Sequence, residues 1–198
     1  NTPPTNLFWV MSMLYFIVPL LLTCLILCEI MLIQWRNREF LIQKLSQTDP
    51  LTDLWNRRSF HEQVQSLQRL NKPFAIVILD LDHFKTINDQ YGHSIGDDTL
   101  KVVSKALVKY VPQHDIVARY GGEEFVAVLP RCSREEAYLL MEDIRKRFGE
   151  ISFTTDQKTF HVTLSAGIAS LDASITRADQ LLQSADAALY RAKDAGRN

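Results

Sequence analysis

The chain has 198 residues, 46% of them hydrophobic and 23% charged, and its formal net charge is −1. This length allows one domain of ordinary size with a further segment beside it. Because a bulk nucleic-acid binder carries a strong positive excess, we expect no nucleic acid among the partners. The three cysteines, Cys24, Cys28 and Cys132, show neither metal-site spacing with histidines nor a disulfide framework.

The first predicted element is a membrane-spanning helix. Residues 7–28 read LFWVMSMLYFIVPLLLTCLILC and carry no charge, and about 20 apolar residues are enough to cross a bilayer. Trp35, Arg36 and Arg38 then suit a cytoplasmic interfacial anchor. We therefore expect a transmembrane helix over residues 7–33, with the lipid bilayer as a partner and the inner membrane as its location. The alternative is a helix buried in a soluble core.

The flanks of this helix have predicted roles of their own. Residues 1–6 are expected to be an extracytoplasmic stub of a longer, truncated upstream region, and residues 34–47 a helical signalling linker. Trp35, Ile42 and Leu45 fit part of a heptad, but an arginine occupies an intervening core position. The pattern leaves open a coiled coil and a simple amphipathic connector.

From Thr48 onward, helix and strand signals alternate. Strand-like apolar runs cover residues 73–82, 116–120, 125–129 and 160–170, and the first of these is apolar enough to be central in a sheet. This order predicts an α+β sandwich in which helices pack on a sheet with antiparallel strands. Helical spacing and capping residues predict helices over residues 56–70, 83–91, 95–111, 133–148 and 176–195.

Acidic residues stand out at two places in this pattern. Asp80 ends the most apolar strand, where an ionised carboxylate is costly unless it is paired or bound to metal. Glu123 and Glu124 follow two glycines that suit a tight hairpin with positive φ. If this hairpin lies next to the first strand, the carboxylates converge into a site for Mg²⁺ and phosphate. Plainer alternatives are an ordinary hairpin, solvated glutamates, and Asp82 as the N-cap of the helix that starts at His83.

Four motifs carry a resemblance to a known family: TDPLTDLWNRR (48–58), LDLDHFKTINDQYGHSIGDDTL (79–100), RYGGEEF (119–125) and YRAKDAGRN (190–198). In this order they resemble the GGDEF-type diguanylate cyclases, here as a GGEEF variant, over residues 48–198. The resemblance implies a five-stranded sheet flanked by helices, akin to the polymerase palm and the adenylate cyclase core, for the domain that the positive-inside pattern places in the cytoplasm. It also implies that a homodimer condenses two GTP into cyclic di-GMP and two pyrophosphates.

The resemblance further implies metal ligands and catalytic groups. Asp80, Glu123 and the backbone carbonyl of Leu81 match the ligands of Mg²⁺, two ions per active site, with Mn²⁺ as an alternative. Glu123 matches the acceptor of the 3′-hydroxyl proton, and Glu124 would assist at the metals. Arg119 is assigned to structure or to a dimer contact.

Substrate contacts are implied in the same way. Asn88 and Asp97 match guanine-reading positions, whose amide and carboxylate suit the guanine edge. Lys193 and Arg197 match contacts to the β- and γ-phosphates, and their spacing of four suits one helix face; the alternative is a solvated helix end. His93 has a packing or capping role as its alternative. The remaining positions are Lys85, which would meet the phosphates, and Gly121 and Gly122, which would leave room for them.

One departure from the family pattern concerns product inhibition. Many members carry Arg-x-x-Asp at an inhibitory site, and this chain has Pro112 and Asp115 in that window. Proline supplies no guanidinium, so we expect this site not to be intact and feedback through it to be absent or weak. The alternative function is a catalytically silent GTP-binding module that regulates a partner. Such modules usually lack a motif glycine or a metal carboxylate, and this chain retains them.

Overall fold

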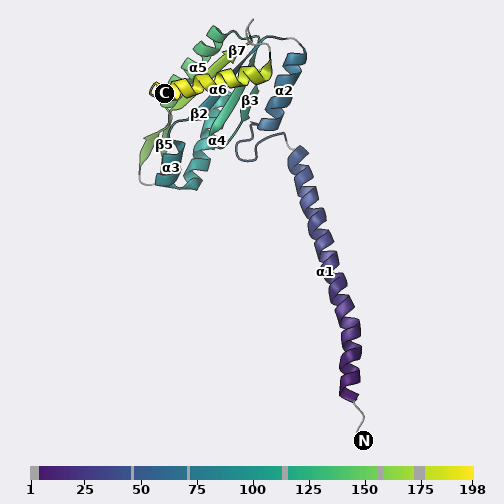
Figure 1. Ribbon diagram of the computed structural model, residues 1–198. Helices are drawn as coiled ribbons and strands as arrows, with labels where there is room; N and C mark the ends of the chain where they lie inside the picture. Colours follow the sequence, from purple (N-terminus) through teal and green to yellow (C-terminus); the bar gives the residue numbers. More distant parts are fainter. Residues whose placement is uncertain (1–4, 46, 71, 113–115, 156–157, 172–176) are drawn as a thin grey trace. The chain divides into compact units, whose positions relative to one another are not determined.

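One long helix, α1 (Thr5–Leu45), precedes a compact unit formed by residues 47–198 (Figure 1). The structure is a computed structural model. It describes the whole chain except residues 1–4, 46, 71, 113–115, 156–157 and 172–176.

α1 joins the predicted membrane span and the predicted linker into one helix. Its segment Trp9–Ile42 has a mean hydropathy of 2.7, and by length and composition it could cross a membrane. None of this segment's most apolar stretch is buried by protein, unlike the core helix of a soluble domain. Pro19 lies inside the helix and does not end it.

The compact unit is built on a five-stranded mixed sheet, as the family resemblance implied. β1 pairs with β3 in parallel, and every other neighbouring pair is antiparallel. β2 is an interior strand, and all eight of its residues are buried, as its apolar sequence predicted. Across the sheet the strands follow the order β1 (Trp55–Asn56), β3 (Ile116–Arg119), β4 (Glu124–Pro130), β2 (Phe74–Leu81) and β7 (Leu164–Ser170).

Helices cover both faces of this sheet, so the α+β prediction is confirmed (Figure 1). On one face, Ile76 and Ile78 of β2 share a core with α2 (Arg57–Arg69) and α6 (Ala178–Asp194). On the other, Val77 and Leu79 pack with α3, α4 and α5, because successive strand side chains point to opposite faces. The helices of this second face are α3 (Phe84–Tyr91), α4 (His93–Tyr110) and α5 (Arg134–Gly149).

α6 lies directly on β7 at Gly167. A Cβ at this position would overlap the backbone of Ala185 and Leu189, so the helix can approach this closely only because the residue is glycine. The close contact fixes where the last turn of α6 lies above the sheet. Lys193, in the last turn of α6, is therefore positioned by a glycine that lies far from it in the sequence.

Some boundaries differ from the predictions. The strand predicted over residues 160–170 is two strands, β6 (Thr159–His161) and β7, and β6 pairs with the unpredicted β5 (Ser152–Thr154). The two strands are separated near Thr163. The carbonyl of this residue accepts a hydrogen bond from the amide of Asp82, at 2.9 Å. The two-residue strand β1 was also not predicted.

Candidate active site

The predicted carboxylates do converge at one end of the sheet. Asp80 is the cross-strand partner of Glu124 in the β2–β4 ladder, so both side chains lie on the same face. The amide nitrogen of Leu81 lies 3.4 Å from the carbonyl oxygen of Glu123. The hairpin predicted to lie beside the first strand therefore does so, and it brings Glu123 and Glu124 to the buried Asp80.

Lys193 supplies a positive charge to this group. Its Nζ lies 2.8 Å from Oδ1 of Asp80, whose side chain is 7% exposed. Burial, followed by the negative charge of Asp80 and then that of Glu124, raises the pKa of Glu123 above its ordinary value of 4.5, and Lys193 opposes this shift. The site is thus a group of three carboxylates with one compensating ammonium from α6.

The signature turn forms without the backbone conformation that its glycines were predicted to need. The amides of Tyr120 and Gly121 both donate to the carbonyl of Glu124, at 2.8 and 3.2 Å, which closes the turn. Neither Gly121 nor Gly122 has a positive φ, so that prediction was wrong. A Cβ on Gly121 would lie 2.7 Å from Oε2 of Glu124, so a side chain at position 121 would displace the end of this glutamate.

Arg119 holds this turn to the start of the compact unit. Its Nη2 donates to the carbonyl of Gly122 at 2.8 Å, and its Nη1 donates to Oδ1 of Asp49 at 3.1 Å. The same carboxylate accepts from the amide and hydroxyl of Thr52. Although burial alone would raise the pKa of Asp49, the bonds to Thr52 and Arg119 hold it below its usual value. The structural role assigned to Arg119 is therefore visible.

The candidate guanine-reading residues lie on two consecutive helices, Asn88 on α3 and Asp97 on α4. A Cβ on Gly96 would overlap the amide oxygen of Asn88, which puts Asn88 of α3 against the residue that precedes Asp97 in α4. Gly92, with φ 84°, makes the turn between the two helices. His93 starts α4, and it is exposed rather than packed in the core. Lys85 is also exposed, in the first turn of α3.

Two sequence expectations about this end of the molecule were wrong. Asp82 does not cap α3, because the residue at the cap is His83, with φ 58° and no side-chain capping bond. Lys193 and Arg197 do not share a helix face, because α6 ends at Asp194 and Arg197 has φ 66°. Glycine at 196, with φ 120°, reverses the chain between them.

Comparison with known proteins decides the family. The model of the family described as "Diguanylate cyclase, GGDEF domain" matches residues 46–198. The chain belongs to the GGDEF family. A diguanylate cyclase of Vibrio cholerae serotype O1 is 39% identical over 165 residues, which are 81% of this chain and 50% of that protein. Diguanylate cyclase DgcP of Pseudomonas aeruginosa is 40% identical over 155 residues, 76% of this chain and 23% of DgcP.

A solved GGDEF domain has the same fold. The domain of DgcB from Caulobacter crescentus, crystallised with c-di-GMP, superposes with a TM-score of 0.72 at 30% identity and covers 77% of this chain and 93% of that one. The present chain spans half or less of the two curated relatives described above. The likeness therefore concerns the GGDEF domain.

The donor set of this GGDEF domain fits a magnesium ion that is completed by a substrate. Among the described residues, no three His, Cys, Asp or Glu side chains are close enough to form a metal cage by themselves. Asp80, Glu123 and the Leu81 carbonyl offer hard oxygen atoms, and Mg²⁺ typically takes one or two carboxylates together with substrate phosphates and waters. The raised pKa of Glu123 is the electrostatic sign of a site that a cation would relieve.

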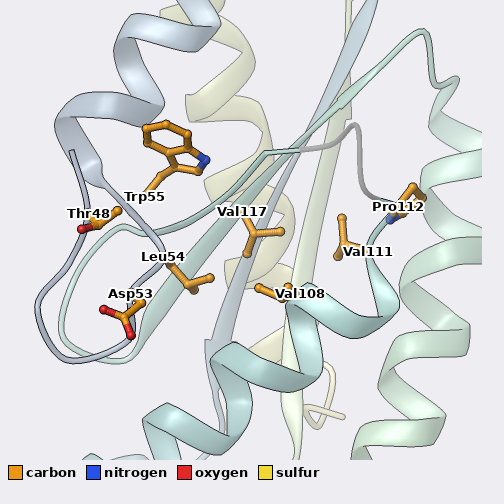
Figure 2. A pocket seen from close by; sticks show the side chains of 8 residues that line it. All are labelled: Thr48, Asp53, Leu54, Trp55, Val108, Val111, Pro112 and Val117. Carbon is orange, nitrogen blue, oxygen red and sulfur yellow. The ribbon is translucent and has the colours of Figure 1, made fainter.

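A surface cavity of the GGDEF domain lies apart from these residues. It has a volume of 590 Å³ and opens between the segment that precedes α2 and the end of α4 (Figure 2). Pro112 lines it beside Val108 and Val111, where the family's inhibitory site would place an arginine. The accompanying Asp115 lies outside the described residues. The described wall at this position therefore presents apolar side chains in place of a guanidinium.

Proposed function

We propose that this chain is a diguanylate cyclase, which condenses two GTP into cyclic di-GMP and two pyrophosphates. The observation that carries the proposal is the group formed by Asp80, Glu123 and Glu124, with Lys193 at 2.8 Å from Asp80. Curated diguanylate cyclases at 39 and 40% identity support it. GTP is then the substrate, and a homodimer is required because each copy presents one nucleotide.

Each site residue has a chemical role in this proposal. Asp80, Glu123 and the Leu81 carbonyl would hold two Mg²⁺, which neutralise phosphate charge and acidify the 3′-hydroxyl when they are bound. Glu123, which matches the family's proton acceptor, would take the hydroxyl proton as a general base. Lys193 exchanges Asp80 for a phosphate oxygen when the nucleotide arrives.

The remaining residues orient the nucleotide. Asn88 and Asp97 read the guanine edge, since a carboxylate accepts from N1–H and N2–H₂ and an amide both donates and accepts. Lys85 and Arg197 approach the phosphates, and His93 lies at the rim of the same site. Gly121 and Gly122 leave space at the turn, where a Cβ on Gly122 would meet no atom within 4 Å.

α1 gives the proposed enzyme its location. We assign residues 7–33, as predicted from the sequence, to the inner membrane, with the GGDEF domain in the cytoplasm; they overlap the segment Trp9–Ile42, which is long and apolar enough to cross a bilayer. The part of α1 beyond the membrane would carry a signal by setting how two domains meet. The competing proposal, a silent GTP-binding module, is disfavoured because Asp80, Glu123 and the motif glycines are all retained.

Product formation by the purified full chain tests this function. In detergent with GTP and Mg²⁺ the wild type should yield cyclic di-GMP, identified by chromatography, and Glu123→Gln should yield none. Glu135→Gln, which removes an exposed carboxylate from the first turn of α5, should match the wild type. GTP binding without product from any variant would favour the silent module.

A further inference from the structure

Asp82 is a second buried carboxylate, two residues after Asp80, and it has an entirely different set of partners. It is 4% exposed. Its Oδ1 accepts from the hydroxyl of Ser165 at 2.7 Å, and its Oδ2 accepts from the hydroxyl of Thr163 at 2.7 Å and from the amide of Asn198 at 3.3 Å. Two donors come from the β7 side of the sheet, whereas the third comes from the end of the YRAKDAGRN motif.

The chain reverses direction after α6, and hydrogen bonds hold both Arg197 and Asn198 in this reversed segment. The amide of Arg197 donates to the carbonyl of Ala192 at 3.1 Å. Asn198 is bound from two sides, through its amide by Asp82 and through its side-chain oxygen by Nη1 of Arg145 at 3.0 Å. Arg197 adopts φ 66°, a left-handed conformation that is uncommon for a non-glycine residue. The bonds to Asn198 hold the residue that follows it.

The two aspartates therefore hold the same motif by different means. Asp80 binds the side chain of Lys193, a contact that a nucleotide phosphate would replace. Asp82 is buried and binds the main chain of Asn198, and both of its carboxylate oxygens accept hydrogen bonds from within the domain. The Asp80 contact thus joins two side chains, whereas the Asp82 contact fixes one point of the backbone.

We propose that Asp82 is a positioning residue for triphosphate binding: it holds the backbone of the segment 195–198 so that Arg197 is presented to the phosphates. This inference rests on the proposed function, because it takes the phosphates of GTP as the ligand of Arg197. A purely structural role, in which Asp82 only joins the end of β2 to Thr163 and Ser165, makes a different prediction. Loss of that role would weaken every nucleotide equally or lower stability alone.

Nucleotide binding by the full chain in detergent separates the two roles. With Mg²⁺ present, Asp82→Ala should weaken a non-hydrolysable GTP analogue by about tenfold and leave GMP binding unchanged. Asp82→Asn should rescue analogue binding, because its amide oxygen still accepts from Asn198 and a neighbouring hydroxyl can rotate to accept from its NH₂. The matched control is Thr163→Val, which removes one bond to the same carboxylate but leaves the Asn198 amide bound, and it should bind the analogue almost as the wild type does.

A double-mutant cycle identifies the residue through which Asp82 acts. In an Arg197→Ala background, Asp82→Ala should cause no further loss of analogue binding, since residues that act as a unit are not additive. If Asp82→Ala does not fold, Arg145→Ala replaces it in the same cycle, because it releases Asn198 from the other side. The inference would be overturned if Asp82→Ala weakened GMP binding and analogue binding equally, or if its loss of affinity added to that of Arg197→Ala. The proposed function would still stand in that case, provided that the wild type makes cyclic di-GMP. A wild type that binds no analogue would overturn both.

Discussion

At the scale of single residues, the candidate site has more negative than positive charge, because three carboxylates lie near one lysine. Glu123 lies near Asp80 and Glu124, and its pKa is raised by burial first and by these two charges next. A carboxyl group with a raised pKa binds its proton more tightly in the folded state than in the unfolded state. Its contribution to stability is therefore lost as pH rises through that pKa, so at neutral pH the ionised group opposes folding.

Glu123→Gln should raise the melting temperature of the full chain in EDTA, because it removes the repelled charge and retains the shape of the side chain. The increase should be small, since 1 kcal/mol shifts the melting temperature of a domain of this size by about 2–4 °C. The same variant should lose the stabilisation that Mg²⁺ with a GTP analogue confers on the wild type. In the wild type this stabilisation should decline as pH falls through the raised pKa of Glu123, because the protonated group is not a ligand.

Thermal unfolding with and without Mg²⁺ measures both effects. Glu135→Gln is the control, since it removes a carboxylate of the same kind from an exposed position of α5. A lower melting temperature for Glu123→Gln in EDTA would contradict the electrostatic argument.

Pro112 makes a residue-scale prediction about regulation. It follows Val111, the residue after α4, and lies beside Val108 in the wall of the cavity, and it supplies no cation for a phosphate. Cyclic di-GMP should therefore not inhibit the wild type at submicromolar concentration. Pro112→Arg, which completes Arg-x-x-Asp with Asp115, should introduce inhibition that Asp115→Ala removes again. Strong inhibition of the wild type that is itself lost in Asp115→Ala would show that the site is intact.

At the scale of elements, the placement of α6 depends on Gly167. Gly167→Ala places a methyl group against the backbone of Ala185 and Leu189, and overpacking of this kind costs about 1–3 kcal/mol. The variant should melt at a lower temperature and should also show a raised KM for GTP, because a displaced α6 carries Lys193 away from Asp80. The control is Gly149→Ala at the end of α5, where a Cβ meets nothing within 4 Å. If Gly167→Ala were destabilised but kept the KM of the wild type, the contact between α6 and β7 would not be needed to position the site.

The elements also show what a sequence reader can and cannot infer. β2 was predictable because an interior strand reads as an unbroken apolar run, and the N-cap of α5 was predictable because Ser133 and Glu136 form a local capping box. β1 was missed because two residues carry no periodicity. Asp82 was misread because its partners are 81 to 116 residues away, a separation that no local pattern encodes.

The same limit applies inside the candidate site. The local signals singled out Asp80 and the glutamates, which the fold brings near one another, since a carboxylate at the end of a buried strand is costly on its own. The bond from Arg119 to Asp49 joins residues 70 positions apart, and nothing in either motif alone predicts it. Motifs thus single out the candidate groups, while the contacts that hold them arise from the sheet topology.

At the scale of the whole molecule, α1 and the GGDEF domain address two different requirements. α1 is one helix from residue 5 to residue 45, so the predicted membrane span and the predicted linker are continuous. The Asp49–Arg119–Gly122 contacts then join the beginning of the compact unit to the signature turn. A single domain, however, contains one set of these groups, whereas the proposed product needs two GTP activated against each other.

Reconstitution with a controlled number of copies tests this requirement. In lipid nanodiscs that hold two copies, the full chain should make cyclic di-GMP, and in discs that hold one copy it should make none, although both should bind a GTP analogue with the same affinity. The physical reason is that one copy brings only one nucleotide, so no 3′-hydroxyl faces an α-phosphate. Two-copy discs of Glu123→Gln provide the inactive control. Equal activity per copy in the two preparations would mean that a single chain completes the reaction, and the dimer requirement would have to be abandoned.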